Sequence, residues 1–231
     1  MIRGYRDFIG HGIPLDLSRI VVGGISIHYV DSVGVIIDSK FTWKPQIEAV
    51  AKRVNRAIYS LQFFRHFTSF NLRKQLVSAL ALCYLDYCSL VYSNISDELR
   101  LKLQRLQNKC IRYVTGLRRD DHVTPARRQL NWLTTDMRRM YFSAIIIYIA
   151  CRIGQPSYLA ELFEKRVYTR PVRGDVIPEL KLPKLSTVTG RSSLSYKAVK
   201  FWNELPNRIR DIPSLGSFKI ALYRHLFAID R

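Results

Sequence analysis

The sequence feature that most constrains the fold is a helical spacing of apolar residues between Pro45 and Gly116. Apolar residues recur here three and four positions apart, which places them on one face of a helix. A first helix is predicted from Pro45. A second is predicted from about Asn71 to Tyr92, and its middle, apolar on most sides, is typical of the central helix of a bundle. The residues that define the two faces are Ile47, Val50, Val54, Ile58, Leu61 and Phe64 in the first helix and Leu72, Leu76, Leu80 and Leu85 in the second.

A third predicted helix has the clearest boundaries. Ser96 is a favourable N-cap, Asp97 and Glu98 stand in the first turn, where the helix dipole favours anions, and Gly116 ends the helix. Its predicted buried stripe consists of Leu99, Leu103, Leu106, Cys110 and Val114. Four cations occupy a separate sector roughly 80° wide at about 100° per residue. We call these four residues the cationic ridge: Lys102, Arg105, Lys109 and Arg112.

Two further helices are predicted after the bundle. Thr124 and Pro125 read as an N-cap followed by proline at the first helical position. Thr135 opens the next helix, and Gly154 and Pro156 close it.

The remaining elements are short, so the predicted fold class is mainly α: a helical bundle with a small N-terminal β hairpin. Residues 19–29 alternate around a Gly-Gly turn, which is a hairpin signal, and 33–37 predict another strand. A proline-containing loop with a short hairpin near 178–195 is followed by two or three helices. The predicted parts are 1–43 with the strands, 44–118 with the bundle, 119–165 with a helical extension, and 166–231 with the loop, hairpin and C-terminal helices.

The charge of the chain predicts a polyanionic partner. Lys and Arg number 37 against 18 for Asp and Glu, a formal net charge of +19. Nucleic acid is the favoured partner, and an anionic membrane surface is the second candidate. A solvated helix face usually carries Glu four positions from its cations, and the cationic ridge nearly lacks this pattern. The predicted nucleic-acid-binding residues are Lys52, Arg53, Arg56, Lys102, Arg105, Lys109, Arg112, Arg118 and Arg119.

Neighbouring residues extend this bias. Arginines occur as adjacent pairs at 118–119, 127–128 and 138–139, and Arg suits bidentate contact with phosphate. Tyr113, Trp132 and Tyr141 lie near these charges and could stack on bases, although core packing is the favoured interpretation of each.

The sequence predicts no catalytic residue, no metal ligand and no cofactor. Asp31 is a single carboxylate and is interpreted as an ordinary turn residue. Asp120, Asp121 and His122 could form an acid or a weak metal site, but the favoured interpretation is a loop paired with Arg118 and Arg119. The four cysteines lack metal-site spacing and are predicted to be buried free thiols: Cys83, Cys88, Cys110 and Cys151.

Nothing in the sequence predicts a membrane segment or secretion. The longest apolar run, 144–151, is shorter than the about 20 residues that cross a bilayer. Residues 1–20 lack the apolar core and the cleavage site of a signal peptide. The chain is therefore expected to be an intracellular protein of the cytoplasm, the nucleus or both.

Five segments resemble, in this order, the C-terminal portion of jockey-type non-LTR retrotransposon reverse transcriptases. The match extends from about Ile25 to Leu226 and consists of GVIIDSKFTWKPQIEAVAKRV, LDYCSLVY, KLQRLQNKCIRYVTGLRRDDHVTP, LNWL with MRRMYF, and FWNELPNRIRDIPSLGSFKIALYRHL. The resemblance implies the region after the catalytic Asp-Asp turn: the last palm strands, the thumb helices and a C-terminal extension. Residues 31–34 depart from the family pattern, where relatives usually have a few more residues.

The resemblance also implies a function. A thumb lies against the template–primer duplex, so RNA, DNA or an RNA–DNA hybrid is the expected partner, and the upstream palm and fingers are an expected protein partner. The family's catalytic carboxylates have no counterpart here, so Mg²⁺ is expected only in the complete enzyme and this chain alone is expected to be inactive. Two alternatives remain: a part that regains activity when joined to its palm, and a domesticated basic helical module that binds RNA or a protein partner.

Overall fold

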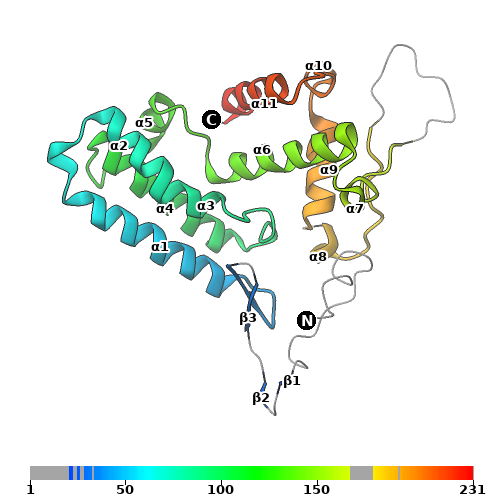
Figure 1. Ribbon diagram of the computed structural model, residues 1–231, viewed down its shortest axis with the longest axis horizontal. Helices are drawn as coiled ribbons and strands as arrows, with labels where there is room; N and C mark the ends of the chain where they lie inside the picture. The colour runs from blue at the N-terminus through cyan, green and yellow to red at the C-terminus, as the bar shows by residue number, and fades with distance from the viewer. Residues whose placement is uncertain are drawn as a thin grey trace. The chain divides into compact units, whose positions relative to one another are not determined.

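The structure is a computed structural model that describes residues 21–22, 25–26, 29–32, 34–166, 179–191 and 193–230. The described residues are mainly helical, which confirms the predicted class (Figure 1). The chain divides into two compact units, Met1–Glu48 and Ala49–Arg231. The four predicted parts stay a prediction.

The first unit contains two short antiparallel hairpins. In the first, β1 (Val21–Val22) pairs with β2 (Ile25–Ser26), and the predicted Gly-Gly turn lies outside the described residues. In the second, β3 (Tyr29–Ser32) pairs with β4 (Val35–Asp38). Asp31 was expected in a turn, but it lies within β3 opposite Ile36, and the chain reverses at Gly34 instead, where φ is 72°. Glycine adopts this left-handed backbone without steric cost, which explains the position of the turn.

Asp38 fixes the chain between β4 and α1 (Lys44–Gln62). Its carboxylate accepts hydrogen bonds from the backbone N–H and the hydroxyl of Thr42 and from the N–H of Trp43, at 2.9–3.0 Å. Burial by itself would raise the pKa of Asp38, but these hydrogen bonds outweigh burial and lower it. The first helix therefore begins where a carboxylate orders the preceding turn.

In the second unit, the predicted third helix is confirmed as α4 (Asp97–Thr115). The hydroxyl of Ser96 accepts a hydrogen bond from the N–H of Leu99, and Gly116 ends the helix with a φ of 82°. All five residues of the predicted stripe are buried, and Gln107, Ile111 and Tyr113 are buried with them. Capping chemistry and periodicity were enough to predict this element.

The second predicted helix is shorter and less buried than expected. It consists of α2 (Phe70–Val77), the π-helical segment η3 (Ser78–Leu82) and α3 (Cys83–Asp86), and it ends at Asp86 rather than Tyr92. The chain turns because Cys88 has a φ of 50°, a left-handed backbone that cannot continue a right-handed helix. Leu72 and Leu80 were expected in the core but are exposed.

The short helix after the bundle begins earlier than predicted. Its bounds are α5 (Val123–Gln129), and His122 rather than Thr124 holds the N-cap position. Pro125 is therefore the third helical residue. Proline is tolerated there because the first four N–H groups of a helix have no partner within the helix.

The later part of the chain packs a second core around α6 (Thr135–Tyr148), α9 (Leu194–Glu204) and α11 (Leu215–Ile229). Tyr148 stacks on Phe218, with ring centroids 4.3 Å apart, and its hydroxyl donates hydrogen bonds to two backbone carbonyls. As predicted, Thr135 is the first residue of α6 and Gly154 ends the helical run. The shorter helices are η2 (Arg65–Phe67), η4 (Ile149–Ile153), α7 (Ser157–Ala160), α8 (Val188–Arg191) and α10 (Asn207–Arg210).

The hairpin predicted near 178–195 is wrong for the described residues of that range. Leu180 forms an isolated bridge with Lys165, and 188–191 are helical. The hydrogen bonds of Leu180 explain the difference, because the side chain of Asn203 on α9 donates to its carbonyl and accepts from its N–H, each at 2.9 Å. A helix side chain therefore replaces the strand partner. Residues 167–178 of the predicted loop lie outside the described residues.

Candidate nucleic-acid interface

Two hydrogen bonds place α1 and α4 side by side. The ammonium of Lys109 on α4 donates to the side-chain oxygen of Asn55 on α1 at 2.7 Å. The hydroxyl of Tyr113 donates to the backbone carbonyl of Leu61 at 3.0 Å. The two contacts occur in the same order along both helices, so the helices run parallel here.

Exposed cations from both helices meet along this contact. On α1, Lys52 and Arg56 are four residues apart and exposed. On α4, Arg105 and Lys109 are exposed and Lys102 is half-buried. Lys109 reaches Asn55, which lies between Lys52 and Arg56 in sequence, so this contact brings cations of the two helices to one surface of the bundle. We call this surface the α1–α4 face, formed by Lys52, Arg56, Lys102, Arg105 and Lys109.

The remaining predicted residues lie at the margins of this face. Arg53 lies toward α3, since its guanidinium carbon is 6.0 Å from the ring centroid of Tyr84. Arg112, the last residue of the cationic ridge, donates to the carbonyls of Arg118 and Asp121 and so holds the loop that follows α4. Of the four ridge residues, Lys109 therefore contacts α1 and Arg112 holds the loop after α4.

Arg118 and Arg119 are exposed in that loop. The loop is closed by Asp121, whose carboxylate accepts a hydrogen bond from the backbone N–H of Arg118 at 2.6 Å. The sequence predicted a loop here, but with an ion pair between the side chains. The backbone satisfies the carboxylate instead, and neither guanidinium forms an ion pair with a carboxylate of the described residues.

The predicted binding residues share one property: within the described part of the chain, none of the nine forms an ion pair with a carboxylate. Other arginines are used differently. Arg127 pairs with Asp230, Arg138 with Asp86, and Arg139 with Asp136. Three of the arginines that extended the basic bias in the sequence are therefore engaged within the fold, where a carboxylate partner offsets the cost of burying a guanidinium.

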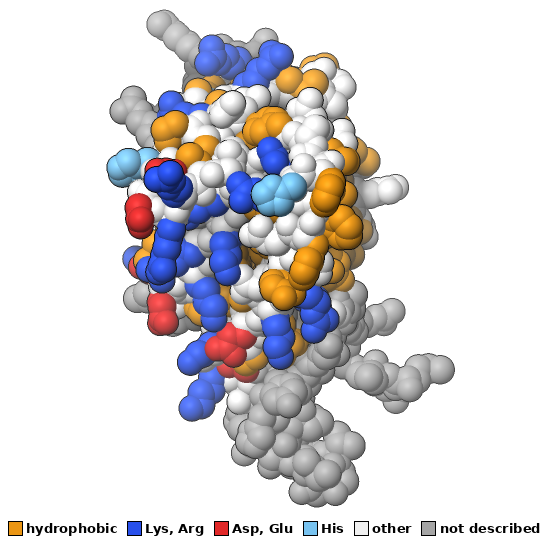
Figure 2. All heavy atoms as spheres, turned by 90° about the vertical axis from the view of Figure 1, so that its left-hand side faces the viewer, with side chains coloured by type: hydrophobic (Ala, Val, Ile, Leu, Met, Phe, Trp, Pro, Cys, Tyr) orange, Lys and Arg blue, Asp and Glu red, His pale blue; other side chains and the backbone are white. Residues whose placement is uncertain are grey.

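An exposed group of aromatic rings lies where α1 leads into α2. The exposed fractions are 68% for Tyr59, 64% for Phe63, 60% for Phe64 and 88% for Phe67. Tyr59 and Phe63 make an edge-to-face contact with ring centroids 5.4 Å apart. We call these four residues the aromatic corner. Figure 2 views this end of the bundle and shows a band of Lys and Arg side chains with hydrophobic side chains beside it.

The aromatic corner was missed by the sequence reasoning. Phe64 was predicted on the buried face but is exposed. Of the three aromatics considered for stacking, Tyr113 and Trp132 are buried and Tyr141 is half-buried. The available signal was the loss of helical spacing after Leu61, where two adjacent phenylalanines cannot both face one core. Exposed rings beside cations are a common arrangement for contacting bases.

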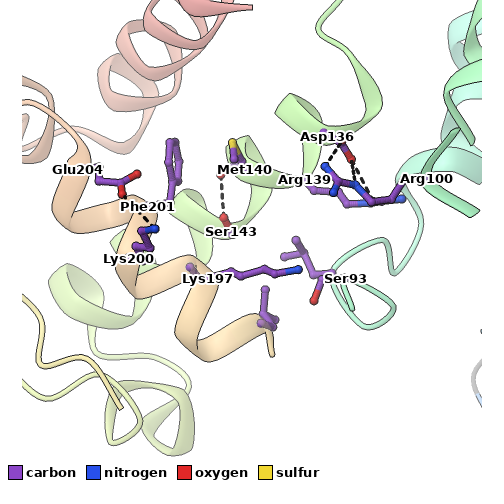
Figure 3. Close-up of a pocket in the computed structure, with 13 residues that line it drawn as sticks. Ser93, Arg100, Asp136, Arg139, Met140, Ser143, Lys197, Lys200, Phe201 and Glu204 are labelled. Atoms are coloured by element: carbon purple, nitrogen blue, oxygen red, sulfur yellow. Dashed lines mark hydrogen bonds and ion pairs between the residues drawn. The ribbon is translucent and has the colours of Figure 1, made fainter. Parts of the chain in front are cut away.

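A separate pocket lies between α6, α9 and the residues that precede α4, with a volume of about 310 Å³. Figure 3 shows Arg100 and Arg139 on either side of Asp136, which accepts from them at 2.8 and 3.3 Å. Lys197 extends across the same pocket. Burial lowers the pKa of Lys197, and the charges of Arg100 and Arg139 lower it further. Asp136 already neutralises part of this cluster, so the α1–α4 face is the stronger candidate.

Thiols and carboxylates do not gather at this interface. In the part of the chain that the structure describes, no three His, Cys, Asp or Glu side chains are placed to hold a metal ion together. Of the four thiols that were predicted to be buried, only Cys110 is; Cys83 is exposed and the other two are half-buried. Among the described helices, none combines the length and hydrophobicity needed to cross a bilayer.

Comparison of the chain with protein families, with curated proteins and with solved structures finds no match.

Proposed function

We propose that the chain binds nucleic acid through the α1–α4 face, as the thumb and C-terminal fragment of a non-LTR retrotransposon reverse transcriptase. The observation that supports this most strongly is the Lys109–Asn55 contact between two parallel helices, whose cations have no carboxylate partner among the described residues. A cation without a carboxylate partner gains the full benefit of counterion release when it meets a phosphate. The specific assignment to a reverse transcriptase rests on the sequence resemblance.

The spacing of the cations suits a nucleic-acid backbone. From Lys102 to Lys109 the α-helix rises by about 10 Å at 1.5 Å per residue. That length corresponds to roughly three nucleotide steps at 3.4 Å per step along one strand. Arg105 and Arg56 can each grip a phosphate with two N–H groups, while the lysines act as point charges. Such contacts position a duplex and carry no sequence preference.

The aromatic corner would extend the same interface to unpaired bases. Its rings lie at the end of the bundle where α1 finishes, close in sequence to Arg56. Every base has a flat face that can stack on an exposed aromatic ring, so this contact tolerates any sequence. A backbone-tracking face beside a stacking platform fits a junction between duplex and single strand.

The proposed role is binding, in the cytoplasm or the nucleus where RNA and DNA occur. Primer extension would require the family's palm carboxylates and their Mg²⁺, for which this sequence offers no counterpart. The upstream palm and fingers are the proposed protein partner. The other candidate is a domesticated module, in which the same surface would bind RNA or a protein instead of a template–primer duplex.

A pair of charge-matched variants tests the proposal. The first changes Lys52, Lys102, Arg56 and Arg105 to Gln. The control changes Lys184, Lys219, Arg208 and Arg224 to Gln. In each set three side chains are exposed and one is half-buried, and no member forms an ion pair with a described carboxylate. Both variants therefore lose two lysines and two arginines at the surface.

Affinity for a B-form duplex is measured by fluorescence anisotropy at several salt concentrations. Log affinity changes with log salt by about −0.9 per neutralised phosphate, so the first variant should flatten the slope by roughly 3 to 4 units. The control should change it much less. If the two variants had the same salt slope, the α1–α4 face would be a solvated surface that does not contact phosphate. The interaction-module alternative would then remain.

A further inference from the structure

Arg210, on the short helix α10, is a buried charge with too few partners. The residue is only 4% exposed. Nη2 donates to the side-chain oxygen of Asn207, one turn earlier. Nε and Nη1 are shielded from solvent and have no hydrogen-bond partner among the described residues. A buried guanidinium normally has a carboxylate partner, and within the described residues Arg210 has none.

Arg210 lines a pocket of about 260 Å³, which we call the Arg210 pocket. Its wall also includes Arg152 and Lys165, which come from η4 and from the segment after α7, and the indole of Trp202. Arg152 is held against α10, since its Nη2 donates to the carbonyl of Arg210 at 3.3 Å and to the carboxylate of Asp211 at 3.2 Å.

The charges around this pocket do not balance. Arg152, Lys165 and Arg210 contribute three positive charges, and Asp211 contributes one negative charge from a largely exposed side chain. The same positive charges act on the thiol of Cys151. Burial raises the pKa of Cys151, while the charges of Lys165 and Arg152 lower it. Three cations therefore converge on one cavity that holds a single, weakly placed carboxylate.

We propose that the Arg210 pocket binds a phosphate monoester. A guanidinium presents N–H groups in a planar fork that matches two oxygens of a phosphate, and a small turn of the Arg210 side chain would aim Nε and Nη1 into the cavity. Arg152 and Lys165 would neutralise the remaining charge. The volume is close to the lower end of small-molecule sites, so it suits a phosphate with a small organic group attached.

This site is independent of the α1–α4 face. Its residues follow α6 in the chain, and none of them belongs to the nine predicted nucleic-acid-binding residues. The phosphate could come from a free monoester or from the 5′ end of a nucleic-acid strand, and the recognising chemistry is the same. Failure of the nucleic-acid proposal would therefore leave this one standing, and the reverse also holds.

Isothermal titration of the full chain tests the proposal with inorganic phosphate, a nucleoside 5′-monophosphate and the unphosphorylated nucleoside, at constant ionic strength. The expected result is saturable binding of both phosphates and not of the nucleoside. Arg210→Gln should abolish this binding, whereas Arg208→Gln, an exposed change on the same helix, should leave it intact. A strand with a 5′-phosphate compared with its 5′-hydroxyl form then identifies the source.

A second variant keeps the test decisive if Arg210→Gln does not fold. Lys165 is exposed, so Lys165→Gln should fold. It should raise the dissociation constant for phosphate about tenfold, because one charge-assisted hydrogen bond is lost. Absence of saturable phosphate binding to the unmodified chain would overturn the proposal. The proposal would also be overturned if the unmodified chain and Lys165→Gln bound phosphate equally. It would likewise be overturned if titration with sulfate gave the same heat as phosphate in the unmodified chain and in every variant.

Discussion

Arg127 and Asp230 form a buried ion pair that joins residues 103 positions apart, with Nη1 of Arg127 2.6 Å from Oδ2 of Asp230. Both side chains are 4% exposed. The same carboxylate accepts hydrogen bonds from the N–H of Thr134 at 2.8 Å and from its hydroxyl at 3.2 Å. Thr134 is also the N-cap of α6. One carboxylate beyond the end of α11 therefore fixes α5 and the start of α6.

Replacing Asp230 by Ala should lower the free energy of unfolding by about 3–5 kcal/mol, because it leaves the Arg127 charge buried without a partner. Asp230→Asn keeps acceptor oxygen and should cost less. Urea unfolding followed by circular dichroism measures the difference. The control is Asp97→Ala, which removes an exposed ion pair with Arg100 and should cost less than about 1 kcal/mol. Equal losses in Asp230→Ala and the control would contradict the structural role of Asp230.

The aromatic corner should contribute to binding single strands and not to stability. The double change Phe63→Ser and Phe67→Ser should weaken binding to a single-stranded oligonucleotide by about 1–3 kcal/mol for each base that stacks. Affinity for a blunt duplex should stay the same. The two rings are largely exposed, so the unfolding midpoint should hardly move.

A matched control changes two exposed hydrophobic residues elsewhere, Leu162→Ser and Ile220→Ser. Anisotropy with single-stranded and duplex probes compares the variants directly. An unchanged single-strand affinity in the phenylalanine variant would remove the aromatic corner from the proposed interface.

The thiols should differ in reactivity. Burial raises the pKa of Cys110 to about 12, and the nearby charge of Lys109 only partly opposes this. Cys83 is exposed. At pH 9, iodoacetamide should therefore modify Cys83 in the folded chain and leave Cys110 unmodified, since the thiolate is the nucleophile. Peptide mass spectrometry reads both sites, and rapid labelling of Cys110 would contradict its burial.

The raised pKa of Cys110 also predicts a pH dependence of stability. The folded-state pKa of about 12 lies above the ordinary thiol value of 9.0. The folded chain therefore holds this proton more tightly, and the resulting stability is complete below about pH 9 and is lost as the pH rises from 9 toward 12. The slope of unfolding free energy against pH should be shallower in Cys110→Ala. Identical slopes would show that the thiol does not contribute.

Local chemistry alone determined α4 and the clustering of its cations. Ser96, Gly116 and the apolar spacing act within a few residues of one another, so the helix, its two ends and its buried stripe follow from the sequence. The same reasoning placed Lys102, Arg105 and Lys109 on one sector, and the structure keeps them exposed or half-buried without an ion pair to any described carboxylate.

Only the tertiary structure decided which charges are free to bind. Arg127 and Arg128 are adjacent and look alike in the sequence, yet Arg127 is buried on Asp230 and Arg128 is exposed. Phe64 fits the apolar spacing of α1 but lies beyond its last turn and is exposed. Arg210 reads as one surface cation among many, yet it is buried. In each case burial and pairing depend on residues distant in the chain, and only folding brings those residues together.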